Sequence, residues 1–263
     1  MRLSTALFLF IVSLFLLVAC NSKKKEPLNT EVEIKNILAE SMQGCNFDSM
    51  KCAQFEVSYP TFKGLDTAVQ TVIMNRIIFN LNNGAIGEEA KLDEQGKEFI
   101  EEYNSFKSET PDLLGRWYRT ISVEVLTFND SLLSLQVSDE SFEGGAHGSY
   151  NLSFVNVRPL DGSIVTLSNL LNTDYEKELN KIGEEIFRAA RELADTASYE
   201  MNGYTFDDNT FALNENYAFR KEGIVFYYNS YEVAPYSLGP TEIVIPYERI
   251  KDWIKAYSSL TMQ

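Results

Sequence analysis

A regular alternation of apolar and polar side chains in the middle of the chain constrains the fold more than any other feature. The alternation runs over residues 121–125, breaks at Asn129 and Asp130, and resumes over residues 133–137. Successive side chains of a β-strand point to opposite faces, so this two-residue period predicts a hairpin with one buried face. A third apolar segment, residues 150–154, follows. The sequence therefore predicts an antiparallel sheet in the middle of the chain.

The segments on either side of this sheet carry a mixture of helix and strand signals. The longest amphipathic stretch, with apolar residues at helical spacing, lies at about 174–198. We expect helices at 30–43, 65–82, 88–106, 174–198 and 250–257, and further strands at 53–59, 217–220, 224–228 and 241–245. Thr30 is expected to cap the helix at 30–43. Pro60 is expected to end the strand at 53–59. This arrangement indicates the α+β class, with antiparallel sheets packed against several amphipathic helices.

The pattern changes after Pro111, which suggests a division of the chain into two parts. We expect an N-terminal α+β half over residues 30–112 and a C-terminal α+β half over residues 113–263. With 263 residues, 44% of them hydrophobic, the chain can bury a large core without a metal. We expect the two halves to pack together as one ectodomain.

The N-terminus carries the signals of an exported lipoprotein. Arg2 precedes an apolar run at residues 7–18, which is shorter than the roughly 20 residues that a transmembrane helix needs. The run ends in Leu-Val-Ala-Cys at residues 17–20, which resembles the bacterial lipobox. We expect a lipoprotein signal peptide over 1–19, lipidation of Cys20 and a tether over 20–29. An ordinary signal peptide with an incidental cysteine is the alternative.

This interpretation places the protein in the bacterial cell envelope, exported and anchored to a membrane, either periplasmic or exposed at the surface. In an oxidising compartment, Cys45 and Cys52 are expected to form a disulfide. The alternative is a metal site, which needs four ligands or three plus water, and a chain with a single histidine supports it poorly. We expect no metal and no cofactor. The net charge of −15 argues against a nucleic-acid partner.

The only histidine lies in an unusual glycine-rich segment at residues 142–150. One interpretation is a catalytic loop in which His147 acts as a base, Ser149 as a nucleophile and Asp139 as the orienting carboxylate. The other is a tight turn that requires glycine, in which His147 packs or forms hydrogen bonds. We favour the second interpretation, because the sequence contains none of the common phosphate-loop, hydrolase or metalloprotease motifs.

A second unusual segment, residues 226–239, is rich in tyrosine. Tyrosine offers a large contact area at a low cost in conformational entropy, so Tyr231, Pro235, Tyr236 and Gly239, together with His147, are candidate binding residues. The alternative is a core strand followed by a loop whose tyrosines pack with their hydroxyl groups at the surface. The two interpretations are compatible.

Together these segments resemble the RsiV-type extracytoplasmic domain family. The resemblance is carried by Gly-Gly-Ala-His-Gly at 144–148, the Tyr150 strand, Asp161-Gly162, residues 167–171 and Tyr-Glu-Val-Ala-Pro-Tyr-x-x-Gly at 231–239. It implies an α+β ectodomain without catalytic activity of its own. The family includes a lysozyme-sensing anti-sigma factor, and similar domains occur beside peptidoglycan deacetylase modules. In this chain a lipobox replaces the transmembrane helix, so we expect binding but not signalling by that route.

Two functional hypotheses follow from the sequence. The first is a lipid-anchored envelope binding module without catalytic activity, which recognises a lysozyme-like muramidase or cell-wall material such as a peptidoglycan fragment. An acidic surface would steer a basic partner of this kind. The second is an envelope hydrolase that uses His147 on peptidoglycan or a related substrate.

Overall fold

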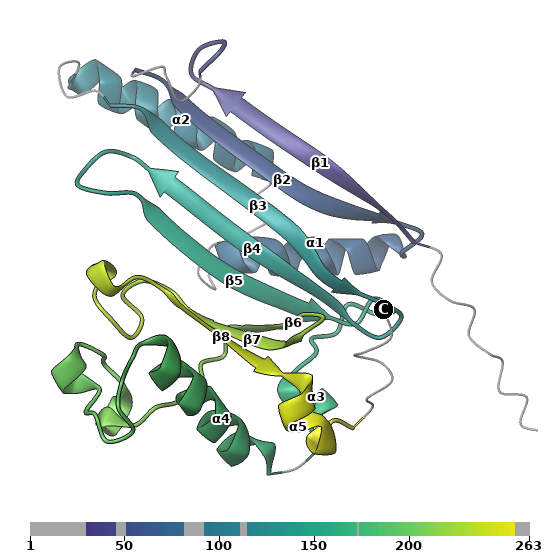
Figure 1. Ribbon diagram of the computed structural model, residues 1–263. Helices are drawn as coiled ribbons and strands as arrows, with labels where there is room; N and C mark the ends of the chain where they lie inside the picture. Colours follow the sequence, from purple (N-terminus) through teal and green to yellow (C-terminus); the bar gives the residue numbers. More distant parts are fainter. Residues whose placement is uncertain (1–29, 46–50, 82–91, 111–114, 173, 256–263) are drawn as a thin grey trace, which may run out of the picture.

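Two β-sheets, one of five strands and one of three, organise the chain (Figure 1). The computed structural model describes residues 30–45, 51–81, 92–110, 115–172 and 174–255. The expected signal peptide, Cys20 and the tether lie outside the described residues. The architecture is α+β, as the sequence predicts.

The larger sheet has the strand order β1-β2-β3-β4-β5. Its strands are β1 (Glu31–Glu40), β2 (Ala53–Lys63), β3 (Trp117–Phe128), β4 (Leu133–Phe142) and β5 (Ser149–Val157). The predicted hairpin is confirmed as β3 and β4, and the third strand as β5. All neighbouring strands are antiparallel except β2 and β3, which are parallel. The sheet therefore runs across position 112, where the sequence pattern suggested a division.

Two helices connect β2 to β3 and cover one face of this sheet. They are α1 (Thr67–Leu81) and α2 (Leu92–Glu109), and both confirm helices predicted from the sequence. A parallel strand pair requires such a crossover connection. Helix α2 packs against β1 and β2, and α1 against β4 and β5 (Figure 1). At Gly96 of α2, a Cβ atom would come within 2.8 Å of the Phe55 ring, so glycine permits the close approach.

The prediction of a helix at 30–43 is wrong, because residues 31–40 form the edge strand β1. Ile37 and Ala39 pack on the helix-covered side, whereas Ile34 and Leu38 project from the other side. Apolar residues on both faces of the strand imitate helical spacing. Pro60 also does not end its strand, because β2 continues to Lys63. The pairing of β2 with β3 stops at Ser58. Beyond Ser58, that side of β2 donates no hydrogen bonds to a neighbouring strand, so a proline, which has no N–H group, is tolerated there.

The smaller sheet contains β6 (Tyr217–Phe219), β7 (Gly223–Tyr228) and β8 (Thr241–Pro246), in that order and antiparallel. These strands confirm the three strands predicted for this part of the chain. The helices around it are α3 (Leu167–Leu170), α4 (Tyr175–Ala190), α5 (Tyr247–Ile250) and the 3-10 helices η1 (Glu200–Asn202), η2 (Asp207–Asn209), η3 (Tyr236–Leu238) and η4 (Lys251–Trp253).

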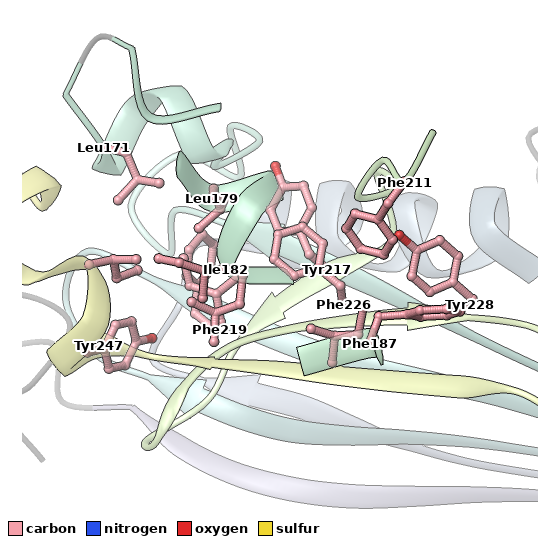
Figure 2. Packing of buried hydrophobic residues seen from close by; sticks show 14 of the residues in the cluster. Leu171, Leu179, Ile182, Phe187, Phe211, Tyr217, Phe219, Phe226, Tyr228 and Tyr247 are labelled. Carbon is pink, nitrogen blue, oxygen red and sulfur yellow. The ribbon is translucent and has the colours of Figure 1, made fainter. Parts of the chain in front are cut away.

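An aromatic core holds α4 against the smaller sheet (Figure 2). Phe187 of α4 is completely buried, and its ring lies 5.5 Å from that of Phe211 and 5.1 Å from that of Tyr204. Burial raises the pKa of Tyr228, whose hydroxyl group donates to the Ala212 carbonyl oxygen. Buried aromatic pairs of this kind dominate the stabilisation of a core.

Helix α4 ends eight positions before the predicted end at residue 198, since its last residue is Ala190. The backbone of Glu192 has a φ of 53°, in the left-handed region, which stops the helix. Leu193 nevertheless packs against the core from the following turn. The apolar stripe therefore continues in the sequence after the helix has ended. The last predicted helix is also short, with α5 and η4 in place of one helix, and residues 256–257 lie outside the described residues.

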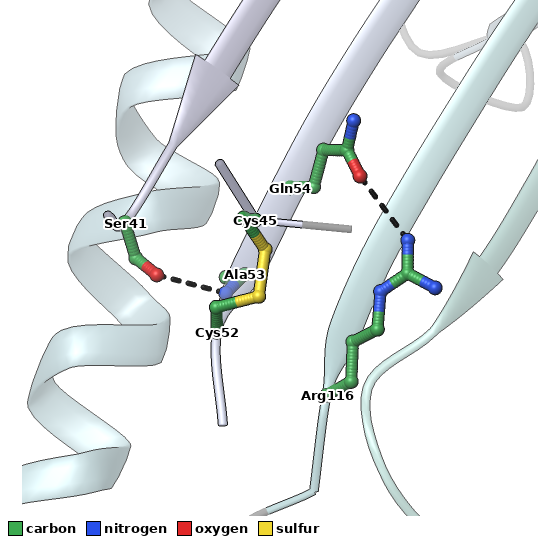
Figure 3. The surroundings of a disulfide bond; sticks show 6 residues. All are labelled: Ser41, Cys45, Cys52, Ala53, Gln54 and Arg116. Atoms are coloured by element: carbon green, nitrogen blue, oxygen red, sulfur yellow. Dashed lines mark hydrogen bonds between the residues drawn. A yellow bond between two sulfur atoms is a disulfide. The ribbon is translucent and has the colours of Figure 1, made fainter. Parts of the chain in front are cut away.

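The predicted disulfide between Cys45 and Cys52 is present (Figure 3). The Cα atoms of the two cysteines are 5.9 Å apart, and both side chains are buried. Next to it, the Ser41 hydroxyl oxygen accepts a hydrogen bond from the Ala53 N–H group at 2.8 Å. The disulfide thus fixes the connection between β1 and β2. Because disulfides persist in oxidising compartments, it indicates an exported domain.

Side-chain hydrogen bonds join the two sheets. The Thr127 hydroxyl group donates to the Phe219 carbonyl oxygen at 2.7 Å, and the Phe219 N–H group donates to the Ser134 hydroxyl oxygen at 3.2 Å. The Asn156 amide donates to the Tyr217 carbonyl oxygen at 2.7 Å. These contacts attach β6 to the ends of β3, β4 and β5. Figure 1 shows the smaller sheet beside β5, with α4 on its far side.

Candidate functional site

The loop between β4 and β5 presents the only histidine. Gly144 and Gly145 have φ angles of 94° and 105°, which side chains rarely allow. At Gly148, a Cβ atom would lie 2.9 Å from the Ser141 carbonyl oxygen. The glycines are therefore required by the shape of the loop, and His147 is held at its exposed tip.

The tyrosine-rich loop between β7 and β8 is folded by a short turn that begins at Asn229. The Glu232 N–H group donates to the Asn229 carbonyl oxygen at 3.1 Å, and the Glu232 carboxylate accepts from the Asn229 N–H group at 2.8 Å. Val233 and Ala234 are buried and anchor the loop. Tyr231 adopts a φ of 70°, which is uncommon for a residue with a side chain. Its ring is left outside the core.

Asparagine side chains seal the free edge of β5 and place the two loops side by side. The Asn229 amide oxygen accepts from the Leu152 N–H group at 2.7 Å, and its nitrogen donates to the Leu152 carbonyl oxygen at 2.9 Å. Asn216 makes the equivalent pair of contacts, with the Phe154 N–H group at 3.1 Å and the Leu152 carbonyl oxygen at 2.8 Å. These amides take the place that a sixth strand would otherwise fill.

His147, Tyr231 and Tyr236 form an exposed cluster, which we call the aromatic cluster. The His147 and Tyr236 rings are stacked, with centroids 4.1 Å apart and planes inclined by 14°. The Tyr231 ring lies 5.7 Å from that of Tyr236. Tyr231 is 64% exposed and Tyr236 43%. The structure therefore brings together three of the candidate binding residues.

The hydrogen bonds of His147 define its tautomer. Its Nδ1 atom lies 2.8 Å from the Gly148 carbonyl oxygen, which can only accept, so Nδ1 carries a proton. In the neutral ring, Nε2 is then an acceptor, and the Tyr231 hydroxyl group lies 3.4 Å from it. Beside these rings is an open hollow of about 320 Å³, lined also by Ser149, Tyr150 and Asn229.

The remaining candidate binding residues shape the Tyr236 turn. Pro235 precedes η3 and is exposed, and the Leu238 N–H group donates to its carbonyl oxygen at 3.0 Å. Gly239 ends η3 with a φ of 67°. The Arg191 guanidinium group donates to the Leu238 carbonyl oxygen at 3.0 Å, so the end of α4 supports this turn.

Asp139 lies away from the histidine, on the helix-covered face of the sheet. Its carboxylate accepts two hydrogen bonds from the Arg119 guanidinium group, at 3.0 and 2.7 Å. Among the described contacts, none joins Asp139 to His147. Ser149 is the first residue of β5, whereas His147 lies in the preceding bend. The two residues are not on one strand, so the alternation of a strand does not point their side chains to the same face. The Ser-His-Asp arrangement of the catalytic interpretation is therefore not assembled.

The residues in the described part of the chain contain no group of three or more His, Cys, Asp or Glu side chains that could hold a metal ion. No helix in the described part is both long and apolar enough to cross a membrane. The site offers exposed rings, hydroxyl groups and one imidazole. Such groups are suited to contact with a partner surface.

The fold and the site define an exported α+β domain with an exposed aromatic cluster, and two family models match it. Residues 48–150 match the model described as "Deacetylase PdaC". Residues 168–248 match the model described as "Protein of unknown function (DUF3298)". No curated protein matches the sequence significantly.

Two crystal structures share the fold over most of the chain. A member of the DUF3298 family from Bacteroides fragilis is 21% identical, with a TM-score of 0.65, covering 88% of this chain and 96% of that one. A DUF3298 family protein from Pseudomonas aeruginosa PAO1 is 22% identical, with a TM-score of 0.61, covering 88% of this chain and 95% of that one. These matches show the shared fold, and both structures carry the family name of the model that matches residues 168–248.

Proposed function

We propose that this protein is a lipid-anchored module of the bacterial cell envelope that binds a lysozyme-like muramidase through the aromatic cluster. The observation that carries the proposal is the stacking of His147 on Tyr236, beside the exposed Tyr231. Rings held in place by the fold lose little entropy on binding, and tyrosine is common among the residues that dominate interface energies.

The charge of the chain supports a basic partner. The net charge is −15, and removal of residues 1–19 would take away one positive charge, that of Arg2. A negative protein attracts a basic muramidase and raises its association rate. Lipidation at Cys20 would hold the module on the membrane, because two or three acyl chains anchor a protein far more firmly than one.

The geometry does not favour a hydrolase. A base in a catalytic triad needs a carboxylate at one ring nitrogen. In this structure the His147 Nδ1 atom donates to the Gly148 carbonyl oxygen, and the Asp139 carboxylate is bound to Arg119. We therefore carry forward the binding hypothesis.

Calorimetric titration of the full chain in mild detergent with chicken-type lysozyme tests this proposal. We expect saturable binding at physiological salt, which Tyr231→Ala combined with Tyr236→Ala weakens by roughly 2 kcal/mol or more. A matched control is Leu160→Ala, which removes an exposed apolar side chain from the turn after β5, away from the cluster. An unrelated protein of equal positive charge controls for non-specific attraction.

Equal binding of lysozyme and the unrelated basic protein would contradict the proposal, as would full affinity in a folded Tyr231/Tyr236 variant. Binding of a peptidoglycan fragment, and not of lysozyme, would assign the cluster to cell-wall material instead.

A further inference from the structure

The face of the larger sheet opposite α1 and α2 carries a continuous row of exposed side chains. Strand register places Leu38 beside Glu56, Glu56 beside Thr120, Thr120 beside Glu140, and Glu140 beside Tyr150. All five side chains are exposed. Neighbouring strands are about 4.8 Å apart, so the row spans about 19 Å across all five strands. We call this row the open-face row.

No element of the described chain covers the centre of this face, which Figure 1 shows on the side away from the two helices. On this face the smaller sheet reaches Ser134, Gln136 and Asn156, and its asparagine side chains reach the backbone of Leu152. The centre is polar, with Ser122 and Ser138 paired across β3 and β4 next to the row. An antiparallel face can remain in water in this way.

Exposed apolar side chains gather at the two edges of the face. On β1, Ile34 and Leu38 are 58% and 57% exposed, and Val32 is 39% exposed on the same side. On β5, Tyr150 is 43% exposed and lines the hollow beside the aromatic cluster. Exposed apolar side chains that lie next to one another, such as Val32, Ile34 and Leu38, mark protein interaction surfaces.

The centre of the face is negative. Within the described residues, no cation pairs with Glu56 or with the exposed Glu124. The Glu140 carboxylate accepts from the Tyr118 hydroxyl group at 3.0 Å. Burial, and then the charges of Glu140 and Glu124, raise the pKa of Tyr150.

Two positive groups are described on this face, and both are already engaged. Arg220 pairs with Glu242 at 3.0 Å and donates to the Gln136 amide oxygen at 3.3 Å. Arg116 lies nearer the row. Its guanidinium carbon lies 5.1 Å from the Tyr118 ring centroid, and it donates to the Gln54 amide oxygen at 3.1 Å. Anionic ligands such as lipid phosphates would be repelled by the uncompensated carboxylates of the face, whereas lysine and arginine side chains would be attracted.

We propose that the open-face row is a docking surface for a basic protein, in which Glu56 and Glu140 pair with lysine or arginine side chains of the partner. Leu38 and Tyr150 make apolar contacts at its two ends, and Tyr150 joins the row to the aromatic cluster. This inference rests on the proposed function, because it names the chemistry of the partner and the surface that the partner covers beyond the cluster.

The test uses two probes, chicken-type lysozyme and octalysine, with the full chain in mild detergent. In one variant Glu56→Gln and Glu140→Gln neutralise the row. In a matched control, Glu98→Gln and Glu101→Gln remove the same charge from exposed positions of α2, on the other side of the sheet. Affinities are measured at several salt concentrations, because salt screens exposed charges.

We expect the row variant to bind both probes about fivefold more weakly and with a smaller salt dependence, while the control binds like the wild type. Equal losses in the two variants would overturn the inference, since net charge alone would then explain them. Binding of a neutral chitin oligosaccharide to the row, without binding of octalysine, would also overturn it.

The two proposals can fail separately. If the binding of octalysine depends on Glu56 and Glu140 but lysozyme does not bind, the docking surface stands and the muramidase proposal fails. If lysozyme binding depends on Tyr231 and Tyr236 but not on Glu56 and Glu140, the muramidase proposal stands and the docking surface fails.

Discussion

The substitution Asn229→Ala tests how the free edge of β5 is stabilised. In the wild type, the Asn229 amide accepts from the Leu152 N–H group at 2.7 Å and donates to the Leu152 carbonyl oxygen at 2.9 Å. Asn216 also donates to that carbonyl oxygen, at 2.8 Å, so the oxygen keeps a partner in the variant. The Leu152 N–H group loses its acceptor, the Asn229 amide oxygen. Leu152 is only 5% exposed.

An unsatisfied buried donor costs about 1–3 kcal/mol. We therefore expect Asn229→Ala to lower the free energy of unfolding by about 2 kcal/mol, or the melting temperature by about 4–8 °C. Urea unfolding, followed by tryptophan fluorescence and circular dichroism, measures this change. The control is Asn202→Ala, which removes an exposed hydrogen bond to the Ser198 carbonyl oxygen and should change stability by less than about 0.5 kcal/mol. Equal effects of the two substitutions would refute this explanation of the β5 edge.

The remaining predictions concern the disulfide and alkaline pH. Replacing Cys45 and Cys52 together by Ser should lower the free energy of unfolding by about 2.5 kcal/mol, as expected from the entropy of so short a loop, and urea titration measures it. An unchanged unfolding midpoint would contradict this. Burial, and then Tyr150 and Glu242, raise the pKa of Tyr227 to about 12 from 10.0. Because unfolded Tyr227 loses its proton more readily, its contribution to stability is complete below pH 10 and should be lost as the pH rises to about 12; Tyr227→Phe should reduce that loss in unfolding experiments at several pH values.

The central hairpin and most helices could be predicted because their side chains are sorted by a single buried face. The alternation at 121–125 and 133–137 corresponds to β3 and β4, which pack one face on the helices. The edge strand β1 was missed because it exposes Ile34 and Leu38 while Ile37 packs inward. A strand with apolar residues on both faces has no clear two-residue period.

Part of the site could have been placed more accurately from the same alternation. Arg119 is in phase with Ile121 of β3, and Asp139 with Val137 of β4, so both belong to the helix-covered face. That phase would have predicted the observed ion pair and separated Asp139 from the loop that carries His147.

The contact between His147 and Tyr236 could not be derived in this way, because it joins loops from different sheets. Asn216 and Asn229, which bring the sheets together, have the composition of ordinary turn residues in the sequence. Their role depends on a free strand edge that only the three-dimensional arrangement reveals.

The join between the two sheets has a mechanical consequence for the aromatic cluster. His147 is carried by the larger sheet, whereas Tyr231 and Tyr236 are carried by the smaller one. Each sheet has its own hydrophobic core, and the join between the sheets consists of side-chain hydrogen bonds and of Leu132, which packs into the core of the smaller sheet. A pulling force on the chain would therefore separate the sheets before it unravelled them. The cluster would come apart at that first step, so ligand binding would report whether the two sheets are still docked.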